Sequence, residues 1–218
     1  MTEADWLACE NPTYAYYMLR AVGNRSRRKD RLAAAAGLRH FWAELTAEQR
    51  RAVTAAERYA DGEIRIPELR AAAVRVVRGA CGTLPWAVAH VTHRVAAYAL
   101  WASKLSFLPV VSGSRVYTNP PPPDAPAYAE GGRPVMAIVR CIYGNPFRPA
   151  TADPSWLTST VVALARSIYA DRAFDRLPIL ADALEDAGCD AADLLSHCRG
   201  DGPHVRGCWA VDLVLGKE

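Results

Sequence analysis

The amino-acid sequence predicts a mainly α-helical protein, with an N-terminal helical bundle and a C-terminal helical subdomain joined by a Pro-rich segment. Three observations predict this class. Ala and Arg are used heavily while Ile and Phe are scarce, a composition that favours helix over sheet. Apolar residues recur at helical spacing along most of the chain. Residues 109–134 alone break that pattern, with a run of prolines and glycines.

With 218 residues, of which 51% are hydrophobic and 22% charged, the chain has the composition of an ordinary globular protein. That length allows one sizeable core or two smaller ones. We therefore expect three parts. They are a helical bundle over residues 1–108, a Pro/Gly-rich connector over residues 109–134 and a C-terminal helical subdomain over residues 135–218.

The first part contains five or six short helices whose starts are marked by capping residues or by proline in the first turn. Thr2 can cap the first helix, and Thr46 with Gln49 forms a capping-box pattern. The expected starts are Thr2, Pro12, Ser26, Thr46, Pro67 and Pro85. The expected apolar stripes are Tyr14, Tyr17, Met18, Ala21 and Val22 on the second helix, and Ala34, Ala35, Leu38, Phe41, Trp42 and Leu45 on the third. Short connections between the helices indicate an α-bundle or an orthogonal array.

The connector contains Asn119–Pro126, which cannot be helical because each proline lacks an amide donor and restricts the residue before it. We expect an extended, polyproline-like surface segment, after which Gly131 and Gly132 allow the chain to turn. Such a segment can be a ligand for a proline-binding domain or simply a connection between two helical parts. Its composition favours the connection.

In the third part, the apolar run Val135–Tyr143 fits a helix or a strand, because periodicity alone does not separate the two. Further on, Asp153 can cap the turn at Pro154, and Asp190 can cap a short helix that runs through Leu195. A last amphipathic helix is expected from about His204 to Leu215. Between these points lie two apolar stripes, Val161, Leu164, Ala165 and Ile168, then Leu177, Leu180, Ala181 and Leu184.

The best candidates for chemistry are three cysteines and two histidines near the C-terminus: Cys189, His197, Cys198, His204 and Cys208. Zinc needs about four nitrogen or sulfur donors in a tetrahedron. Loops between short helices can present Cys198, His204 and Cys208 in this way, with His197 or Cys189 as the fourth ligand. The spacing is not that of a standard zinc finger. The same residues can instead be buried apolar cysteines with His197 as a cation at a helix C-terminus, or a redox pair of thiols.

No catalytic residues are predicted, because the sequence has neither Gly-x-Ser-x-Gly nor a Gly-rich phosphate-binding pattern. His90 and His93 lie one turn apart on an expected helix from Trp86 to about Leu105 and can share a ligand. A partly buried polar seam explains this histidine pair as well. An enzymatic function is therefore not indicated.

The net charge of +3 is small, but its distribution is uneven. Between Arg20 and Arg58 there are ten basic and four acidic residues, whereas from Thr151 to Glu218 there are six basic and eleven acidic ones. The densest basic cluster lies at the start of the third helix and comprises Arg25, Arg27, Arg28, Lys29 and Arg31. Arginines and helix N-terminal amides bind phosphate, so this cluster is a candidate contact for nucleic acid or another partner. A solvated helix face is the alternative.

No stretch of the sequence approaches the ~18–20 apolar residues needed to cross a bilayer. The segment Met1–Trp6 has neither a basic start nor the apolar run of a signal peptide. We therefore expect a cytoplasmic protein without membrane contact. Six cysteines are few for a disulfide scaffold of this length, so we expect thiols or metal ligands.

Several motifs outside the proline segment carry a family resemblance: Asp5–Cys9, Ala56–Gly62, Gly144–Pro149, Phe174–Leu184, His197–Arg199 and His204–Trp209. On these motifs the chain resembles an uncharacterised paralogous protein family that is abundant in planctomycete bacteria. The resemblance implies no established activity. Relatives often carry a cysteine pair in the third helix, where this sequence has Ala35–Gly37, so the resemblance implies that any role of that pair is absent here.

The sequence therefore predicts a non-catalytic helical interaction or regulatory module that binds a protein partner. This prediction depends on the missing catalytic signatures and on the opposite charges of the two halves. Two alternatives stay open. One is a zinc-stabilised protein or enzyme that uses the cluster between Cys189 and Cys208. The other is a nucleic-acid-associated factor that uses the basic cluster between Arg25 and Arg31.

Overall fold

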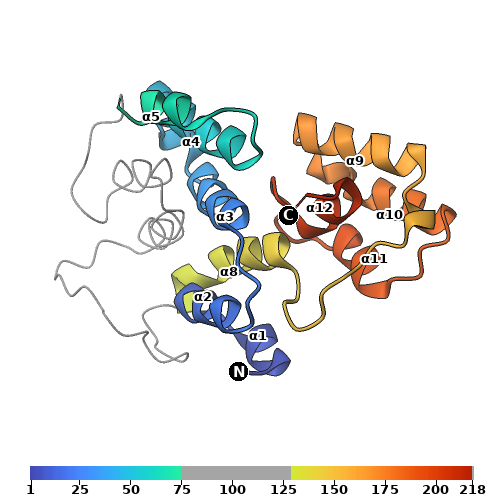
Figure 1. Ribbon diagram of the computed structural model, residues 1–218. Helices are drawn as coiled ribbons and strands as arrows, with labels where there is room; N and C mark the ends of the chain where they lie inside the picture. Colours follow the sequence, from blue (N-terminus) through green and yellow to red (C-terminus); the bar gives the residue numbers. More distant parts are fainter. Residues whose placement is uncertain (75–128, 218) are drawn as a thin grey trace. The chain divides into compact units, whose positions relative to one another are not determined.

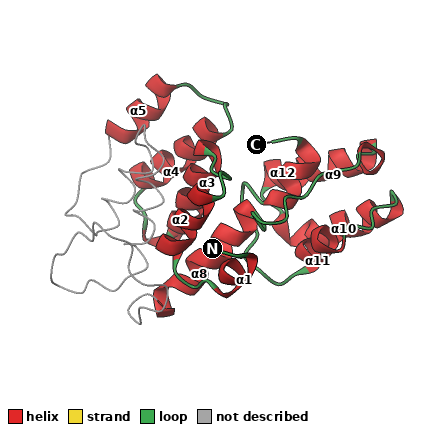
Figure 2. Ribbon diagram, turned by 60° about the horizontal axis from the view of Figure 1, so that its bottom comes forward, coloured by secondary structure: helices red, strands yellow, loops and turns green. Residues whose placement is uncertain are grey.

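The computed structural model describes residues 1–74 and 129–217, and all regular secondary structure in these residues is helical (Figure 1). Figure 2, coloured by secondary structure, shows helices joined by loops in the described part. The predicted mainly α-helical class is therefore confirmed. The chain divides into two compact units, Met1–Val139 and Arg140–Glu218. The pair His90 and His93 and the proline run Asn119–Pro126 lie outside the described residues.

Within residues 1–74, the first unit contains a series of short helices. These are α1 (Glu3–Ala8), α2 (Pro12–Ala21), α3 (Arg27–Arg39), the 3-10 turn η1 (Trp42–Glu44), α4 (Ala47–Ala60) and α5 (Ile66–Val74). Two predicted caps are confirmed, because the hydroxyls of Thr2 and Thr46 each accept a hydrogen bond from the third amide of their helix. Both form complete capping boxes, with Asp5 and Gln49 accepting in return from the cap amide. The predicted start of α3 at Ser26 is also confirmed.

Among the helices described in this unit, the most extensive contact is between α3 and α4, where small side chains let the two helices approach closely. Its apolar cluster comprises Ala34, Ala35, Leu38, Leu45, Ala52, Val53, Ala56 and Leu69. On α2 the predicted stripe was partly wrong, because Ala21 and Val22 are exposed at the helix end. The apolar side chains that α2 buries fully include Ala15, Met18 and Leu19. Their spacing of three and four positions gives a narrower helical stripe than the one predicted.

Helix α8 (Ala129–Tyr143) settles the ambiguous run Val135–Tyr143 as helix. The expected turn at Gly131 and Gly132 was wrong, since both glycines lie inside this helix together with Pro134. Seven apolar residues of its later turns are buried: Val135, Met136, Ile138, Val139, Cys141, Ile142 and Tyr143. Tertiary burial of this kind outweighs the weak helix propensity of two glycines and one proline. The helix enters the second unit at Arg140.

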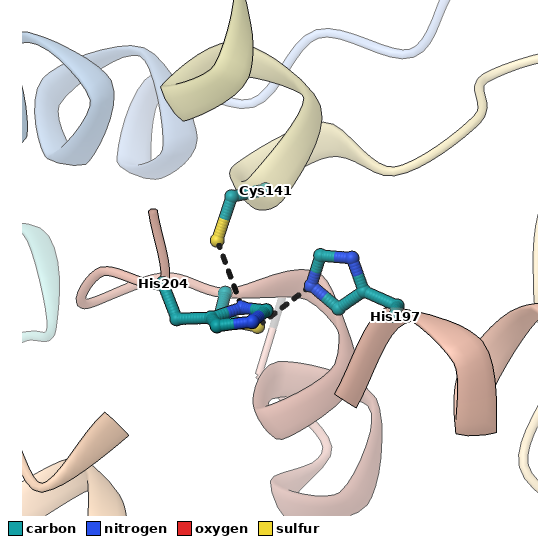
Figure 3. Close-up of side chains that lie close together, drawn as sticks. Cys141, His197 and His204 are labelled. Carbon is teal, nitrogen blue, oxygen red and sulfur yellow. Dashed lines mark hydrogen bonds between the residues drawn. The ribbon is translucent and has the colours of Figure 1, made fainter. Parts of the chain in front are cut away.

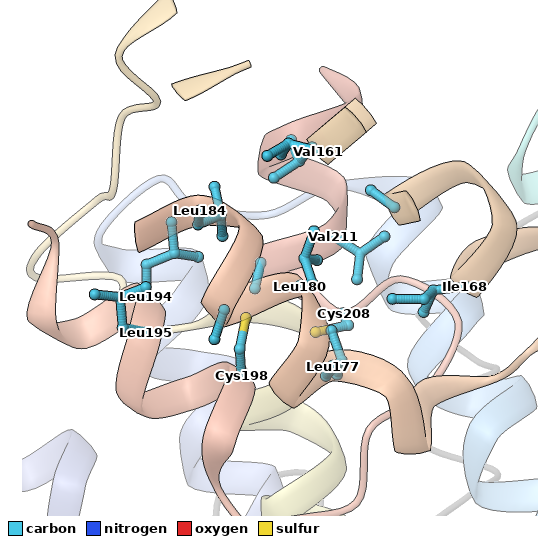
Figure 4. Packing of buried hydrophobic residues seen from close by; sticks show 14 of the residues in the cluster. Val161, Ile168, Leu177, Leu180, Leu184, Leu194, Leu195, Cys198, Cys208 and Val211 are labelled. Atoms are coloured by element: carbon cyan, nitrogen blue, oxygen red, sulfur yellow. The ribbon is translucent and has the colours of Figure 1, made fainter. Parts of the chain in front are cut away.

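The rest of the second unit is built from short helices. These are the 3-10 turn η3 (Pro154–Trp156), α9 (Ser159–Asp171), the 3-10 turn η4 (Phe174–Arg176), α10 (Leu177–Asp186), α11 (Ala192–Arg199) and α12 (Trp209–Leu215). The predicted cap of Asp153 is confirmed, because its carboxylate accepts from the Ser155 amide. The stripe of α10 is buried as predicted, and that of α9 is buried apart from the half-buried Leu164. Figure 4 shows these stripes packed with Leu194 and Val211 into one core.

Two predicted helix starts in this unit were wrong. Helix α11 begins after Ala191, which makes no side-chain capping bond, so Asp190 does not cap it. Helix α12 begins at Trp209, five residues after the predicted start at His204. Gly207 has a φ of 91°, a left-handed conformation that a continuous helix does not contain. Among the described residues, no helix has both the length and the apolar character to span a membrane.

Candidate metal centre

Two cysteines and two histidines of the second unit converge on one point: Cys141, His197, His204 and Cys208. Each offers one ligand atom, and these atoms all lie within 4.8 Å of one another. Cys141 comes from the last turns of α8, His197 from α11, and His204 from the loop before α12 (Figure 3). Cys208 is the residue directly before α12.

Local backbone structure brings these segments together. Gly144 ends α8 three residues after Cys141, and its φ of 64° turns the chain away from the helix axis. On the other side of the cluster, the Cys208 amide donates to the Val205 carbonyl, and Gly207 provides the left-handed turn before it. Cys208 thereby lies beside His197 although it is 11 residues away in the chain.

The interatomic distances are close to those of a tetrahedral metal site. His197 Nε2 lies 3.2 Å from Cys208 Sγ, and His204 Nδ1 lies 4.0 Å from Cys141 Sγ. Zinc bonds of about 2.0–2.3 Å in a tetrahedron place neighbouring ligand atoms about 3.3–3.8 Å apart. Because no pair of these atoms is more than 4.8 Å apart, side-chain shifts of up to about 1 Å would place all four atoms around one ion.

The hydrogen bonding of His204 suits a metal ligand. Its Nε2 lies 3.0 Å from the carbonyl oxygen of Gly200, which can only accept a hydrogen bond. Nε2 therefore carries a hydrogen in this contact, and Nδ1 is left facing the sulfurs, where loss of its own proton would free a lone pair for a metal ion. A histidine ligand held by a carbonyl at its second nitrogen is the usual arrangement in metal sites.

The electrostatics of the cluster favour one thiolate. Burial opposes ionisation of Cys208, but hydrogen bonds from Cys141, His197 and His204 outweigh it and hold the pKa of this thiol well below its usual value. The hydrogen bond to Cys208 in turn raises the pKa of Cys141 well above its usual value. Contact with Cys208 also raises the pKa of His204. The thiolate is the form of cysteine that binds metals, so the environment of Cys208 already favours the ligating state.

The structure unites three of the five predicted ligands, His197, His204 and Cys208, and leaves out Cys189 and Cys198. Both omitted cysteines are buried in the apolar core of the unit (Figure 4 labels Cys198). Burial raises the pKa of Cys198 to about 12, so this side chain is a neutral thiol. The fourth member, Cys141, was missed in the sequence. It lies in an apolar run, where a cysteine ligand and a core cysteine look the same, and only its distance from the histidines in space distinguishes it.

The predicted basic cluster lies in the first unit and makes contacts within it. Arg25 forms an ion pair with Asp30 and lies over the ring of Tyr16. Arg28 Nη2 lies 2.9 Å from Asp61 Oδ1, and the buried Arg31 lies over Tyr59. Burial lowers the pKa of Arg31. The cluster also contains the exposed Arg27 and the half-buried Lys29. A nucleic-acid contact at this cluster stays a prediction.

Comparison with known proteins found no match, whether among protein-family models, curated proteins or solved structures. The resemblance to the planctomycete family therefore stays a prediction.

Proposed function

We propose that this chain is a zinc-binding helical protein in which Cys141, His197, His204 and Cys208 hold one ion that stabilises the C-terminal unit. The observation that carries the proposal is the convergence of these four ligand atoms from separate segments of the chain within 4.8 Å. Two sulfur and two imidazole donors form the Cys2His2 set of structural zinc sites.

The donor chemistry favours zinc over other common ions. Magnesium and calcium prefer oxygen ligands, and the cluster offers none among its four members. Soft thiolates combined with imidazoles in a tetrahedral arrangement suit zinc. Other thiophilic ions can enter the same donor set, so the bound metal must be identified by elemental analysis.

A structural role follows from the number of ligands. Catalytic zinc sites use three protein ligands and keep the fourth position for water or substrate, whereas four protein ligands close the coordination sphere. The cysteines are buried and the histidines half-buried, so the ion would lie at the edge of the core. This assignment agrees with the prediction of a non-catalytic module. A protein partner for that module remains a prediction.

The proposal is tested by the metal content of the protein purified without chelator. We expect about one zinc per chain, and for cobalt-loaded protein a visible spectrum of tetrahedral Co²⁺ with thiolate ligands. Cys141→Ser and Cys208→Ser should each lower zinc affinity by about 100-fold or more. Cys189→Ala and Cys198→Ala are the matched controls and should keep full metal content, because both residues lie outside the cluster.

Two results would contradict the proposal. One is less than about 0.2 metal per chain after incubation of the reduced protein with excess zinc. The other is loss of metal in Cys198→Ala but not in Cys141→Ser, which would restore the ligand set predicted from the sequence.

A further inference from the structure

Trp209 lies next to three of the four proposed ligands or the chain that carries them: Cys208, His197 and the end of the helix with Cys141. It follows Cys208 directly in the chain and is the first residue of α12. Its ring centroid lies 5.1 Å from that of His197, with the two planes inclined by 46°. The ring of His197 also meets that of His204 edge to face, at 4.9 Å between centroids and 89° between planes. The orientation of His197 is thus limited by two neighbouring rings.

The same indole packs against the backbone of Gly144, at the end of the helix that carries Cys141. A Cβ atom built on Gly144 would lie 3.1 Å from Cγ of Trp209 and 3.3 Å from both Cδ1 and Cδ2. Real Cβ atoms seldom approach other atoms so closely, and Gly144 also has a positive φ of 64°. Glycine is therefore required here for its conformation and for the close approach of the ring.

The position of Trp209 differs from that of a residue buried inside the apolar core. Trp209 is only half-buried, whereas the neighbouring residues Ala210 and Val211 on the same helix are fully buried. The indole thus lies at the edge of the core, on the side where the two histidines are also half-buried. The indole contacts the ring of His197, and it contacts Gly144, which follows the helix that carries Cys141.

We infer that Trp209 is the positioning residue of the metal site: it holds His197 in its ligating orientation and fixes the end of α8, which carries Cys141, through Gly144. This inference rests on the proposed zinc-binding function. Residues outside the coordination sphere that orient ligands typically contribute about 10–100-fold to metal affinity. Trp209 acts through van der Waals contact with a ring and a backbone, so the size and planarity of its side chain decide the effect.

The test compares zinc affinities of full-length variants by competition with a chromophoric chelator. Trp209→Ala should weaken zinc binding about 10–100-fold, and Trp209→Phe should restore most of the affinity, since phenylalanine keeps a planar ring. Trp156→Ala is the matched control. Trp156 packs against the apolar core of the same unit, so its removal should lower the unfolding temperature without changing zinc affinity.

A second pair of variants leaves Trp209 in place. Gly144→Ala introduces a Cβ that meets the indole, whereas Gly188→Ala introduces one with nothing within 4 Å. Both glycines have a positive φ, of 64° and 86°, so both substitutions strain the backbone. We expect only Gly144→Ala to weaken zinc binding and to shift the visible spectrum of the cobalt-loaded protein.

The outcomes separate the inference from the proposed function. Wild-type zinc affinity in both Trp209→Ala and Gly144→Ala would overturn the inference and leave the zinc site intact. Failure of the wild-type protein to bind zinc would overturn both. If Trp209→Ala does not fold, the comparison of zinc affinity between Gly144→Ala and Gly188→Ala decides. Equal zinc affinities in these two variants would overturn the inference.

Discussion

At the scale of the residue, burial sets the chemistry of Cys198, which the sequence presents as a reactive or ligating thiol. Burial raises the pKa of this thiol to about 12, so at pH 8 it holds roughly a thousandfold less thiolate than an ordinary cysteine. We predict that iodoacetamide at pH 8 leaves Cys198 unmodified in the folded protein and alkylates it rapidly in denaturant. Mass spectrometry of tryptic peptides measures both reactions.

The same shift predicts how stability depends on pH. Because the fold raises the pKa of Cys198 above its ordinary value of 9.0, the fold favours the protonated thiol. Its contribution to the free energy of unfolding is complete below about pH 9 and is lost as the pH rises toward 12. Cys198→Ala serves as the control and should show a smaller loss of stability over that range. Rapid alkylation of Cys198 in the native protein would show that it is not buried.

At the scale of the element, helix starts in the second unit differ in how they are capped. Thr158 caps α9, since its hydroxyl accepts from the Val161 amide at 3.3 Å, whereas α11 starts at Ala191 without a side-chain cap. We predict that Thr158→Ala lowers the free energy of unfolding by about 1 kcal/mol, and that Asp190→Ala changes it by less than about 0.5 kcal/mol. Urea denaturation followed by circular dichroism measures both values.

A side-chain cap added to helix α11 should raise the stability of the protein. Ala191→Ser places a hydroxyl at the cap position and should stabilise the protein by about 0.5–1 kcal/mol. A loss of about 1 kcal/mol in Asp190→Ala would mean that Asp190 does cap α11 in solution, and the start of this helix would have to be moved by one residue.

At the scale of the whole molecule, the four residues of the proposed metal site all lie in residues 140–217, so removal of a bound zinc ion should act on that unit. Ligand binding stabilises the folded state by an amount that grows with the ratio of free ligand to Kd, about 4 kcal/mol at a thousandfold excess over Kd. We predict that a strong chelator speeds amide hydrogen exchange in α11 and α12 and leaves α3 and α4 unchanged. Hydrogen exchange with mass spectrometry resolves these helices as separate peptides.

Cys141→Ser provides the control for this experiment. Without the site, its exchange should already be fast in α11 and α12 and should not respond to the chelator. Equal acceleration of α3 and α4 would instead indicate that the two units unfold together, and unchanged exchange throughout would indicate that the ion adds no stability.

The sequence by itself determined the features that depend on residues a few positions apart. The helical class, the capping boxes at Thr2 and Thr46 and the buried stripe of α10 were all predictable, because a helix places residues three and four positions apart on one face. His197, His204 and Cys208 were predicted as candidate ligands because they lie within 12 residues of one another in the chain.

Only the tertiary structure decided the rest. It placed Cys141 in the candidate metal cluster and Cys189 and Cys198 in the apolar core, although all of them look alike in the sequence. It also carried α8 through Gly131, Gly132 and Pro134, against local propensity. The physical reason is the same in both cases: burial and contact between distant segments outweigh local preference, and a single sequence contains no direct record of those distances.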